Sequence, residues 1–186
     1  MKYLKSYILF NEDFIVSPTD NVNLSNFKNR YNQVKSFIDE FNSKKTVVEN
    51  IYNNYKDRND LINKLKSQKF LLDDSTPESL KFENPLISIW ADISYYKRKI
   101  TELEDSIKIS GDDIKLKQDQ IKLKPNISDV LSQSIEDINN RISDKNKKIT
   151  DLNQKISEKE QESKDKIKEL SDELIRLQDS INKEEK

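Results

Sequence analysis

Apolar residues recur at alternating steps of three and four over most of the chain, which is the spacing of one face of an α-helix. The pattern is strongest in residues 86–107 and again from about residue 128 to the end. It predicts a mainly α-helical fold, an elongated helical bundle or coiled coil of about three long helices. The residues predicted for the coiled-coil core are Leu86, Ile93, Ile100, Leu103, Ile107, Ile135, Ile138, Ile142, Ile149, Leu152, Ile156, Ile167, Leu170, Leu174, Leu177 and Ile181.

A similar stripe earlier in the chain predicts a first long helix from Leu24 to about Leu72. The stretch "DDSTPESLKFENP" then ends this helix, because each proline disfavours helical geometry at the residue before it. Asn84 followed by Pro85 predicts the start of the next helix, since Asn caps helix N-termini and proline suits the first helical position.

The N-terminal segment has a different pattern. Two short runs rich in aromatic and β-branched residues, 7–10 and 14–16, flank the polar triplet Asn-Glu-Asp. This predicts a short N-terminal β-hairpin, which must dock on something because an isolated hairpin is only marginally stable. The hairpin lies either on the protein's own helices or on a partner, and the residues predicted to dock are Tyr3, Tyr7, Ile8, Phe10, Phe14 and Ile15.

Residues 106–128, "SIKISGDDIKLKQDQIKLKPNIS", repeat an Ile-Lys phrase every seven residues. In a helix, the first apolar residue of each phrase continues the core stripe, and the second lies on the opposite face, at Ile109, Leu116 and Leu123. A pair of helices would leave that second set exposed, and a helix between two others would bury it. Read as strands, the phrases alternate apolar and polar residues, but "KQDQ" is a poor tight turn. We favour the helix, with a break or hinge at Gly111.

A reversal of the chain is predicted at Pro125, because Lys124 is pushed away from helical geometry and Ser128 can cap a helix that begins at Asp129. The alternative is one kinked rod, which the unbroken seven-residue phase across Pro125 allows. The predicted organisation is an N-terminal docking segment at 1–22, a first helix with a proline-containing linker at 23–85, and a coiled-coil hairpin or kinked rod at 86–186.

The composition argues against catalysis. The chain has no Cys, no His and a single Gly, so it lacks the residues for thiol chemistry, histidine acid–base catalysis, the usual zinc sites and glycine-rich phosphate loops. The adjacent carboxylates of Asp112 and Asp113 have the chemistry to ligate a cation, but such a pair is more often a turn or a helix start. We therefore predict no enzyme activity, no cofactor and no metal.

The charge balance bears on partners and location. Lys and Arg total 33 against 34 Asp and Glu, and Asp119 and its neighbours interleave with the lysines of the repeat, which argues against nucleic acid as a partner. The longest apolar run, 7–10, is far shorter than the roughly 20 residues of a membrane-spanning helix, and we read no secretory signal. We expect no membrane contact and a cytoplasmic or virion location.

These features predict a non-enzymatic structural or assembly protein that uses coiled-coil helices as a spacer or scaffold in a larger complex. Its partners are other proteins, further copies of the chain in a homo-oligomer, or both. A phage or viral virion is one such complex, and the AT-rich residue usage, with abundant Lys, Asn and Ile, points weakly to it. The alternative is a chaperone or adaptor that grips partners between helical arms. Some positions of the apolar stripe hold polar residues, namely Ser110, Lys117, Lys145, Glu160 and Ser163. These residues either specify the register or the partner of the coil, or they are ordinary imperfections of a long exposed coil.

Overall fold

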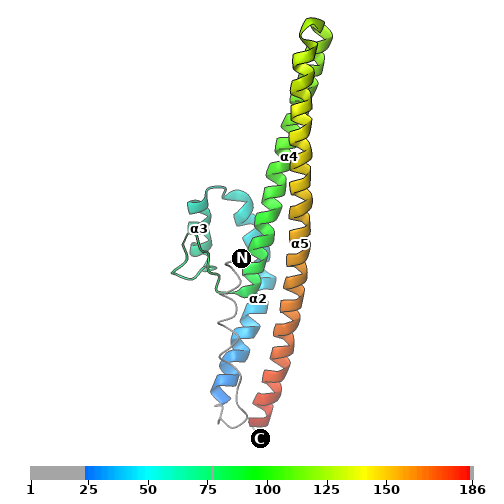
Figure 1. The fold of residues 1–186 in the computed structure, drawn as a ribbon. Coiled ribbons are helices and arrows are strands. Elements are labelled where there is room, and N and C mark those ends of the chain that lie inside the picture. The colour runs from blue at the N-terminus through cyan, green and yellow to red at the C-terminus, as the bar shows by residue number, and fades with distance from the viewer. Residues whose placement is uncertain (1–23, 77, 185–186) are drawn as a thin grey trace. The chain divides into compact units, whose positions relative to one another are not determined.

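The structure of the protein is a computed structural model that describes residues 24–76 and 78–184. Over these residues the protein is mainly helical, as predicted, and has no strand beyond an isolated bridge between Leu71 and Phe82 (Figure 1). The helices are α2 (Leu24–Asn54), α3 (Arg58–Ser67), α4 (Pro85–Leu123), the short 3-10 helix η1 (Pro125–Ile127) and α5 (Ser128–Glu184). The predicted N-terminal β-hairpin and its six docking residues lie outside the described residues. None of the described helices is both long and apolar enough to cross a membrane.

The chain divides into two compact units, and α2 and α5 each contribute to both. Unit 1 comprises Met1–Ser36 and Leu170–Lys186, and unit 2 comprises Phe37–Glu169. In unit 1, the Arg30 guanidinium donates hydrogen bonds to both carboxylate oxygens of Glu173, at 2.7 and 3.2 Å. This two-pronged ion pair joins the described part of α2 in unit 1 to α5.

Within unit 2, α2 and α4 run in the same direction. The rings of Phe41 and Trp90 meet edge to face with their centroids 5.8 Å apart, and farther along both helices the Lys97 ammonium donates to Glu49 at 2.8 Å. Later residues of α2 therefore contact later residues of α4. The connection through α3 supplies the crossover that a parallel pair of helices requires.

The first predicted helix is two helices. α2 ends at Asn54 and α3 begins at Arg58, so the prediction of one helix across this stretch is wrong. The Asp57 carboxylate accepts hydrogen bonds from the backbone amides of Asn59 and Asp60, at 2.9 and 3.0 Å. It thereby caps a new helix and sets the break between the two.

The end of α3 is a Schellman motif. Lys69 adopts a positive φ of 58°, and the Phe70 amide donates to the Leu65 carbonyl at 3.1 Å. Both apolar side chains are buried, as the hydrophobic contact of this motif requires. In the loop that follows, the buried Ser75 hydroxyl bonds both the amide and the carbonyl of Lys81 at 3.0 Å, which fixes the loop path.

The predicted start of α4 is confirmed. Asn84 caps the helix by accepting a hydrogen bond from the Leu86 amide at 3.0 Å, and Pro85 is the first helical residue. The Asn84 side-chain amide also donates to the Phe37 carbonyl at 2.9 Å and to the Glu40 carboxylate at 3.1 Å. The cap therefore also ties the start of α4 to α2.

A helix through the Ile-Lys repeat is confirmed, but the predicted break at Gly111 is wrong. α4 continues without interruption for 39 residues, and a Cβ at position 111 would meet nothing within 4 Å. A single glycine costs a helix only about 1 kcal/mol relative to alanine, which a helix with a packed partner tolerates. The helix thus passes through Gly111 at a modest cost.

The predicted helix boundary at Pro125 is confirmed. α4 ends at Leu123, and α5 begins at Ser128, one residue earlier than expected. Ser128 already has helical backbone angles (φ −55°, ψ −45°), so it does not act as the predicted N-cap. The single turn of η1, opened by Pro125, occupies the place of a cap.

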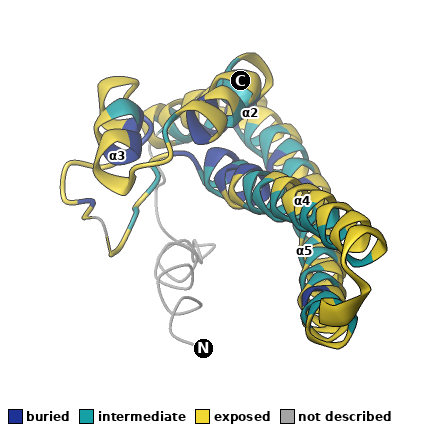
Figure 2. Ribbon diagram, turned by 90° about the horizontal axis from the view of Figure 1, so that it is seen from above, coloured by how far each residue is buried: buried dark blue, intermediate teal, exposed yellow. Residues whose placement is uncertain are grey.

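The core of unit 2 lies where α3 meets the neighbouring parts of α2 and α4 (Figure 2). Beyond Ser94, α4 contributes no buried residue, although the structure describes all of it. The reason is the end of α2, where Arg98 donates to the carbonyls of Tyr52 and Tyr55 at 3.3 and 3.1 Å. Carbonyls at the end of a helix have no partner within it, and Arg98 of α4 supplies one where α2 ends.

Candidate interaction surfaces on the α4–α5 hairpin

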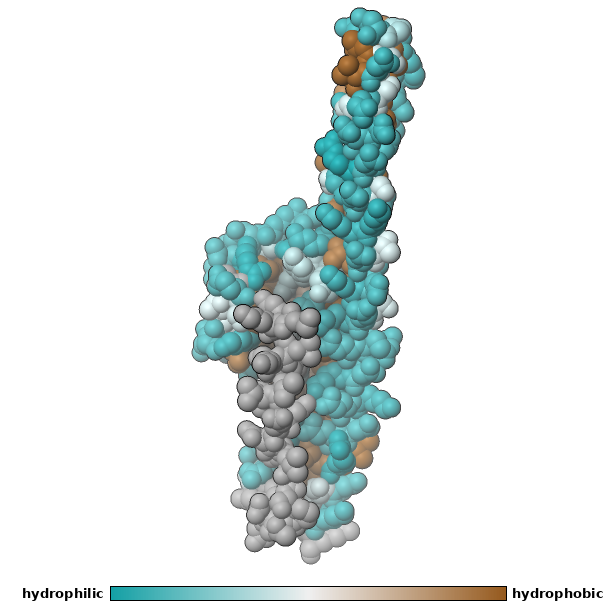
Figure 3. Space-filling view, in the orientation of Figure 1, coloured by the Kyte–Doolittle hydropathy of each residue, from teal (hydrophilic) through white to brown (hydrophobic). Residues whose placement is uncertain are grey.

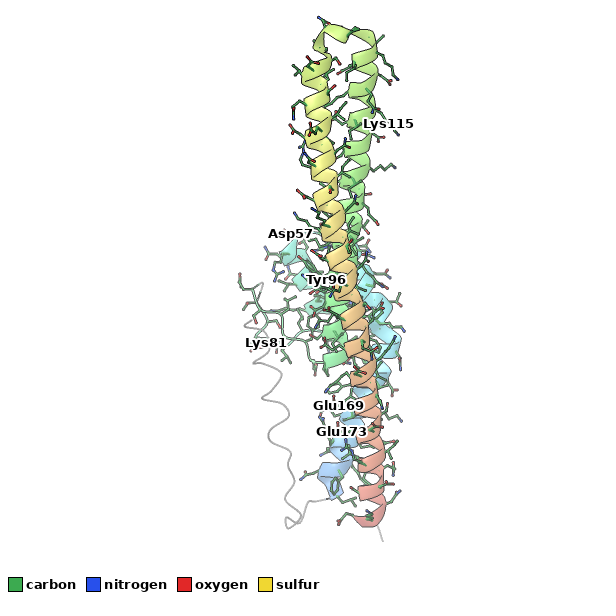
Figure 4. The ribbon with its side chains drawn as sticks, turned by 45° about the vertical axis from the view of Figure 1, so that its right-hand side comes forward. Asp57, Lys81, Tyr96, Lys115, Glu169 and Glu173 are labelled. Carbon is green, nitrogen blue, oxygen red and sulfur yellow. The ribbon has the colours of Figure 1, made fainter. Side chains whose placement is uncertain are left out.

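Helices α4 and α5 run side by side in opposite directions within unit 2 (Figure 4). The contacts that fix their pairing are Asp92 with Lys159 at 3.2 Å, the Tyr96 ring with Lys155 at 5.9 Å, and Ser106 with Lys145 at 2.7 Å. In each pair, the residue of α4 precedes the midpoint between Pro125 and Asn126 by as many positions as the residue of α5 follows it. Two antiparallel helices joined by a turn at Pro125, with no shift of one against the other, pair in this way. One kinked rod would not bring these residues into contact.

Lys159 lies between two carboxylates, Asp92 on α4 at 3.2 Å and Glu162 on its own helix at 2.8 Å. Partial burial lowers the pKa of Lys159, but the hydrogen bond to Glu162 and the charge of Asp92 outweigh it, so the pKa is raised. The Asp92 side chain is 51% exposed, yet the helices around it remove enough water to raise its pKa, and Lys159 offsets only part of that rise. Burial therefore disfavours the charged form of Asp92, whereas the two carboxylates favour the charged form of Lys159.

The residues predicted for the coiled-coil core differ in how far they are buried. None of the predicted coiled-coil core residues is exposed. Leu86, Ile93 and Ile138 are buried in unit 2, Leu170 and Ile181 are buried in unit 1, and the others are half-buried. Half-burial is the expected result where a helix has a single neighbour, which covers only one side of each seam residue.

The polar residues predicted on the stripe differ in their contacts. Lys145 reaches the facing helix, where its ammonium donates to the Ser106 hydroxyl. Lys117 instead pairs with Asp113 on its own helix at 3.2 Å, and the Ser110 hydroxyl donates to the backbone carbonyl of Ser106 at 2.9 Å. Ser163 is buried and Glu160 is exposed. Of this set, Lys145 has the geometry to fix the register.

A second apolar stripe follows the outer face of α4. It consists of Ile109, Leu116 and Leu123, which we call the outer stripe, and these residues are 70%, 59% and 81% exposed. Val130 at the start of α5 is 74% exposed, and a hydrophobic patch lies at this end of the hairpin (Figure 3). Exposed apolar residues are ordinary one at a time, but a set repeated every seven residues lies along one face of the helix.

Aspartates border the outer stripe. On a helix surface, the residues three and four positions away lie beside a given residue. Around Ile109 and Leu116 these neighbours are Asp105, Ser106, Asp112, Asp113, Asp119 and Gln120. No lysine stands in any of these bordering positions.

Lysines form an outer row beyond these aspartates. Lys115 pairs with Asp112 at 3.7 Å and Lys122 with Asp119 at 2.8 Å, and Figure 4 shows Lys115 on the outer side of α4. All four side chains are 66% or more exposed. Ion pairs as open to water as these contribute little and exchange partners easily.

The described residues contain no cluster of three or more acidic, His or Cys side chains placed to hold a metal ion. Asp112 and Asp113, whose adjacent carboxylates have the chemistry to ligate a cation, each pair with a lysine of α4. The chemistry that this surface supports is contact with another apolar and charged surface.

Sequence reasoning missed the cations that surround Trp90. The Lys97 and Lys45 ammonium groups lie 5.2 and 6.0 Å from its ring centre, and Phe41 meets the ring edge-on. Trp90 is half-buried, and its contacts with Phe41 and Lys45 give it a packing role between α2 and α4. The two lysines stand on different helices, so the linear sequence holds no signal that pairs them with the ring.

Comparison with known proteins gives no match: neither a protein-family model, nor a curated protein, nor a solved structure matches the chain. No family is therefore assigned. The function has to be inferred from the chain's own residues.

Proposed function

We propose that the protein is a non-enzymatic assembly protein in which α4 and α5 form a spacer within a larger complex. The observation that carries this proposal is the matched hairpin. α4 has 39 residues, which span roughly 58 Å at 1.5 Å per residue, and its contacts with α5 keep one register over much of that length. A helix pair of this kind sets the separation of its two ends and needs no chemistry of its own.

The seam supports interpreting this hairpin as a coiled coil. Apolar residues recur along it at steps of three and four, and charged residues occupy the outer positions. Coiled coils commonly connect parts of complexes, so the partners in this proposal are other proteins, further copies of the chain, or both. A virion and a cytoplasmic assembly are both complexes in which such a spacer would serve.

A chaperone or adaptor that grips partners between helical arms is the competing function. Gripping requires a gap between the arms. The contact of Lys145 with Ser106 at 2.7 Å instead joins α4 and α5 well along the hairpin, and Ile138 on α5 is only 3% exposed. The closed seam favours the spacer, and the apolar surface that is available lies on the outside of α4.

The test is to purify the full-length tagged chain from cells of its source organism and to measure its mass by light scattering and native mass spectrometry. We expect a complex of fixed stoichiometry. Ile138→Asp buries an unpaired carboxylate in the seam, which costs several kcal/mol, so this variant should lose the complex. Asn140→Asp is the matched control, because it adds a carboxylate two residues away at an exposed position and should keep the complex.

Two results would contradict the proposal. One is a chain that remains monomeric and unaccompanied in its own cells. The other is a chain that suppresses the aggregation of a heat-denatured test protein and then releases it, since that behaviour defines a chaperone.

A further inference from the structure

We propose that the outer stripe of α4 is a docking site for a basic amphipathic helix of a partner protein. This inference rests on the proposed assembly function and identifies the chemistry of one partner. Its basis is the combination of an exposed apolar stripe, a helical repeat and a border of aspartates on the same face of one helix.

The repeat defines the shape of the partner. Ile109, Leu116 and Leu123 follow one another at steps of seven residues, so successive members lie about 10 Å apart along the helix axis. A second helix that presents apolar residues with the same heptad period meets all three at once. A strand has a period of two residues and does not match this spacing.

The outer stripe is open because α2 does not reach it. Among the contacts described between this part of the chain and α4 within unit 2, those of Arg98 lie farthest along α4, and they reach the carbonyls of Tyr52 near the end of α2 and of Tyr55 just after it. Beyond that level α4 has α5 as its described neighbour, and α5 lies on the other side, along the seam. The outer stripe therefore occupies the side of α4 on which a third helix would pack.

The aspartates beside the outer stripe indicate that the partner helix is basic. Each of the first two stripe residues has aspartates beside it, and Asp112 and Asp113 are shared between Ile109 and Leu116. A helix that carries Lys or Arg next to its apolar residues would place those cations against the aspartates. The lysines already paired with Asp112 and Asp119 stand farther out, and their exposed ion pairs are weak enough to be exchanged.

The same border argues against a second copy of the chain as the occupant. Two outer stripes packed face to face would bring the aspartates of one copy against those of the other, and like charges in contact disfavour association. A partner whose apolar stripe is bordered by bases avoids this repulsion.

The test uses the full-length chain and two synthetic three-heptad peptides. Both peptides are amphipathic helices with leucine on the apolar face, and the bordering positions are lysine in one and glutamate in the other. Fluorescence anisotropy of the labelled peptides should show saturable binding of the lysine peptide that weakens as salt is raised, and no binding of the glutamate peptide.

Variants of the chain locate the site. Leu116→Ser removes the middle of the outer stripe and should weaken binding of the lysine peptide roughly tenfold, the equivalent of one buried leucine. Ile175→Ser is the matched control, because Ile175 is 62% exposed and lies in unit 1, and it should leave binding unchanged. The double variant Asp112→Asn with Asp119→Asn keeps the apolar stripe and should reduce the salt dependence.

Three outcomes would overturn the inference: equal binding of both peptides, no binding of the lysine peptide, or binding that Leu116→Ser does not change. Self-association of the wild-type chain that Leu116→Ser abolishes would show that a second copy covers the stripe, and it would overturn the basic partner as well. A chain that still forms its complex of fixed stoichiometry in cells while failing these assays would retain the proposed function and lose only this docking site.

Discussion

Lys145 on α5 donates a hydrogen bond to the Ser106 hydroxyl on α4 at 2.7 Å, and both side chains are half-buried in the seam of the hairpin. A contact of this kind is satisfied in one register only, because a slip of one residue turns each side chain by about 100° around its helix. A lysine that interrupts the apolar stripe in the sequence thus becomes a determinant of pairing in the structure.

The register can be tested directly because the chain has no cysteine of its own. The double variant Ser106→Cys with Lys145→Cys should be joined rapidly within one chain by a short bismaleimide. Ser106→Cys with Leu152→Cys is the control, since residue 152 also lies on the seam but about 10 Å farther along α5. Intact-mass spectrometry measures both yields, and equal yields would refute this register.

The cap of α4 should matter more than the cap of α3. Asn84 is buried and holds both the Leu86 amide and the Phe37 carbonyl, whereas Asp57 is an exposed cap. We expect Asn84→Ala to lower the free energy of unfolding by about 2 kcal/mol or more, because it removes the cap and leaves buried groups without partners. Asp57→Ala should cost about 1 kcal/mol. Urea titrations followed by Trp90 fluorescence would measure both, and equal costs would contradict this reading of Asn84.

The boundaries of α4 were predictable because their signals are local. Asn84 with Pro85 opens the helix, and Pro125 closes it, and each acts through backbone geometry within one or two residues. The break before α3 was missed because apolar residues recur at helical spacing on both sides of it, so the two helices look like one continuous stripe in the sequence. The available signal was Asp57, a capping residue just after an Asn-rich turn, together with the absence of an apolar residue between Tyr55 and Leu61.

At the outer stripe, the sequence predicts which face of the helix the residues occupy but not whether that face is covered. The phase of Ile109, Leu116 and Leu123 on the face opposite the seam follows from helical periodicity alone. Whether another helix covers that face depends on where α2 ends along α4, and at that end Arg98 of α4 contacts the carbonyls of Tyr52 and Tyr55. Those contacts join segments far apart in the chain, and no local pattern specifies them.

Gly111 offers a stability test of the uninterrupted helix. Because a Cβ at this position meets nothing within 4 Å, Gly111→Ala should add helix propensity without a clash. We expect the free energy of unfolding to rise by about 0.5 to 1 kcal/mol, measured by chemical denaturation. A loss of stability would indicate that the chain needs a glycine-like conformation here, as the hinge predicted from the sequence required.

The Asp92 carboxyl gives a pH-dependent prediction. Burial raises its pKa above the ordinary value of 3.8, so the folded chain holds this proton more tightly than the unfolded chain does. Ionisation of Asp92 therefore lowers stability as the pH rises through that range. Asp92→Asn should leave the melting temperature at pH 7 unchanged or higher, even though it removes an ion pair with Lys159, and any gain should vanish below about pH 3.8.

Glu102 supplies the opposite case within the same helix. A hydrogen bond from Lys99 at 2.7 Å lowers its pKa below the ordinary value of 4.5, so its ionised form stabilises the fold above that pH and the contribution is lost as the pH falls through the folded value. Glu102→Gln should lower the melting temperature slightly at pH 7, because the side chain is 35% exposed and water screens the pair, and the difference should disappear in acid. Thermal melts of both variants between pH 3 and 7 make the comparison. If Asp92→Asn destabilised the protein at pH 7 as Glu102→Gln does, pairing with Lys159 would outweigh the burial of Asp92, and that contact would be a source of stability for the hairpin.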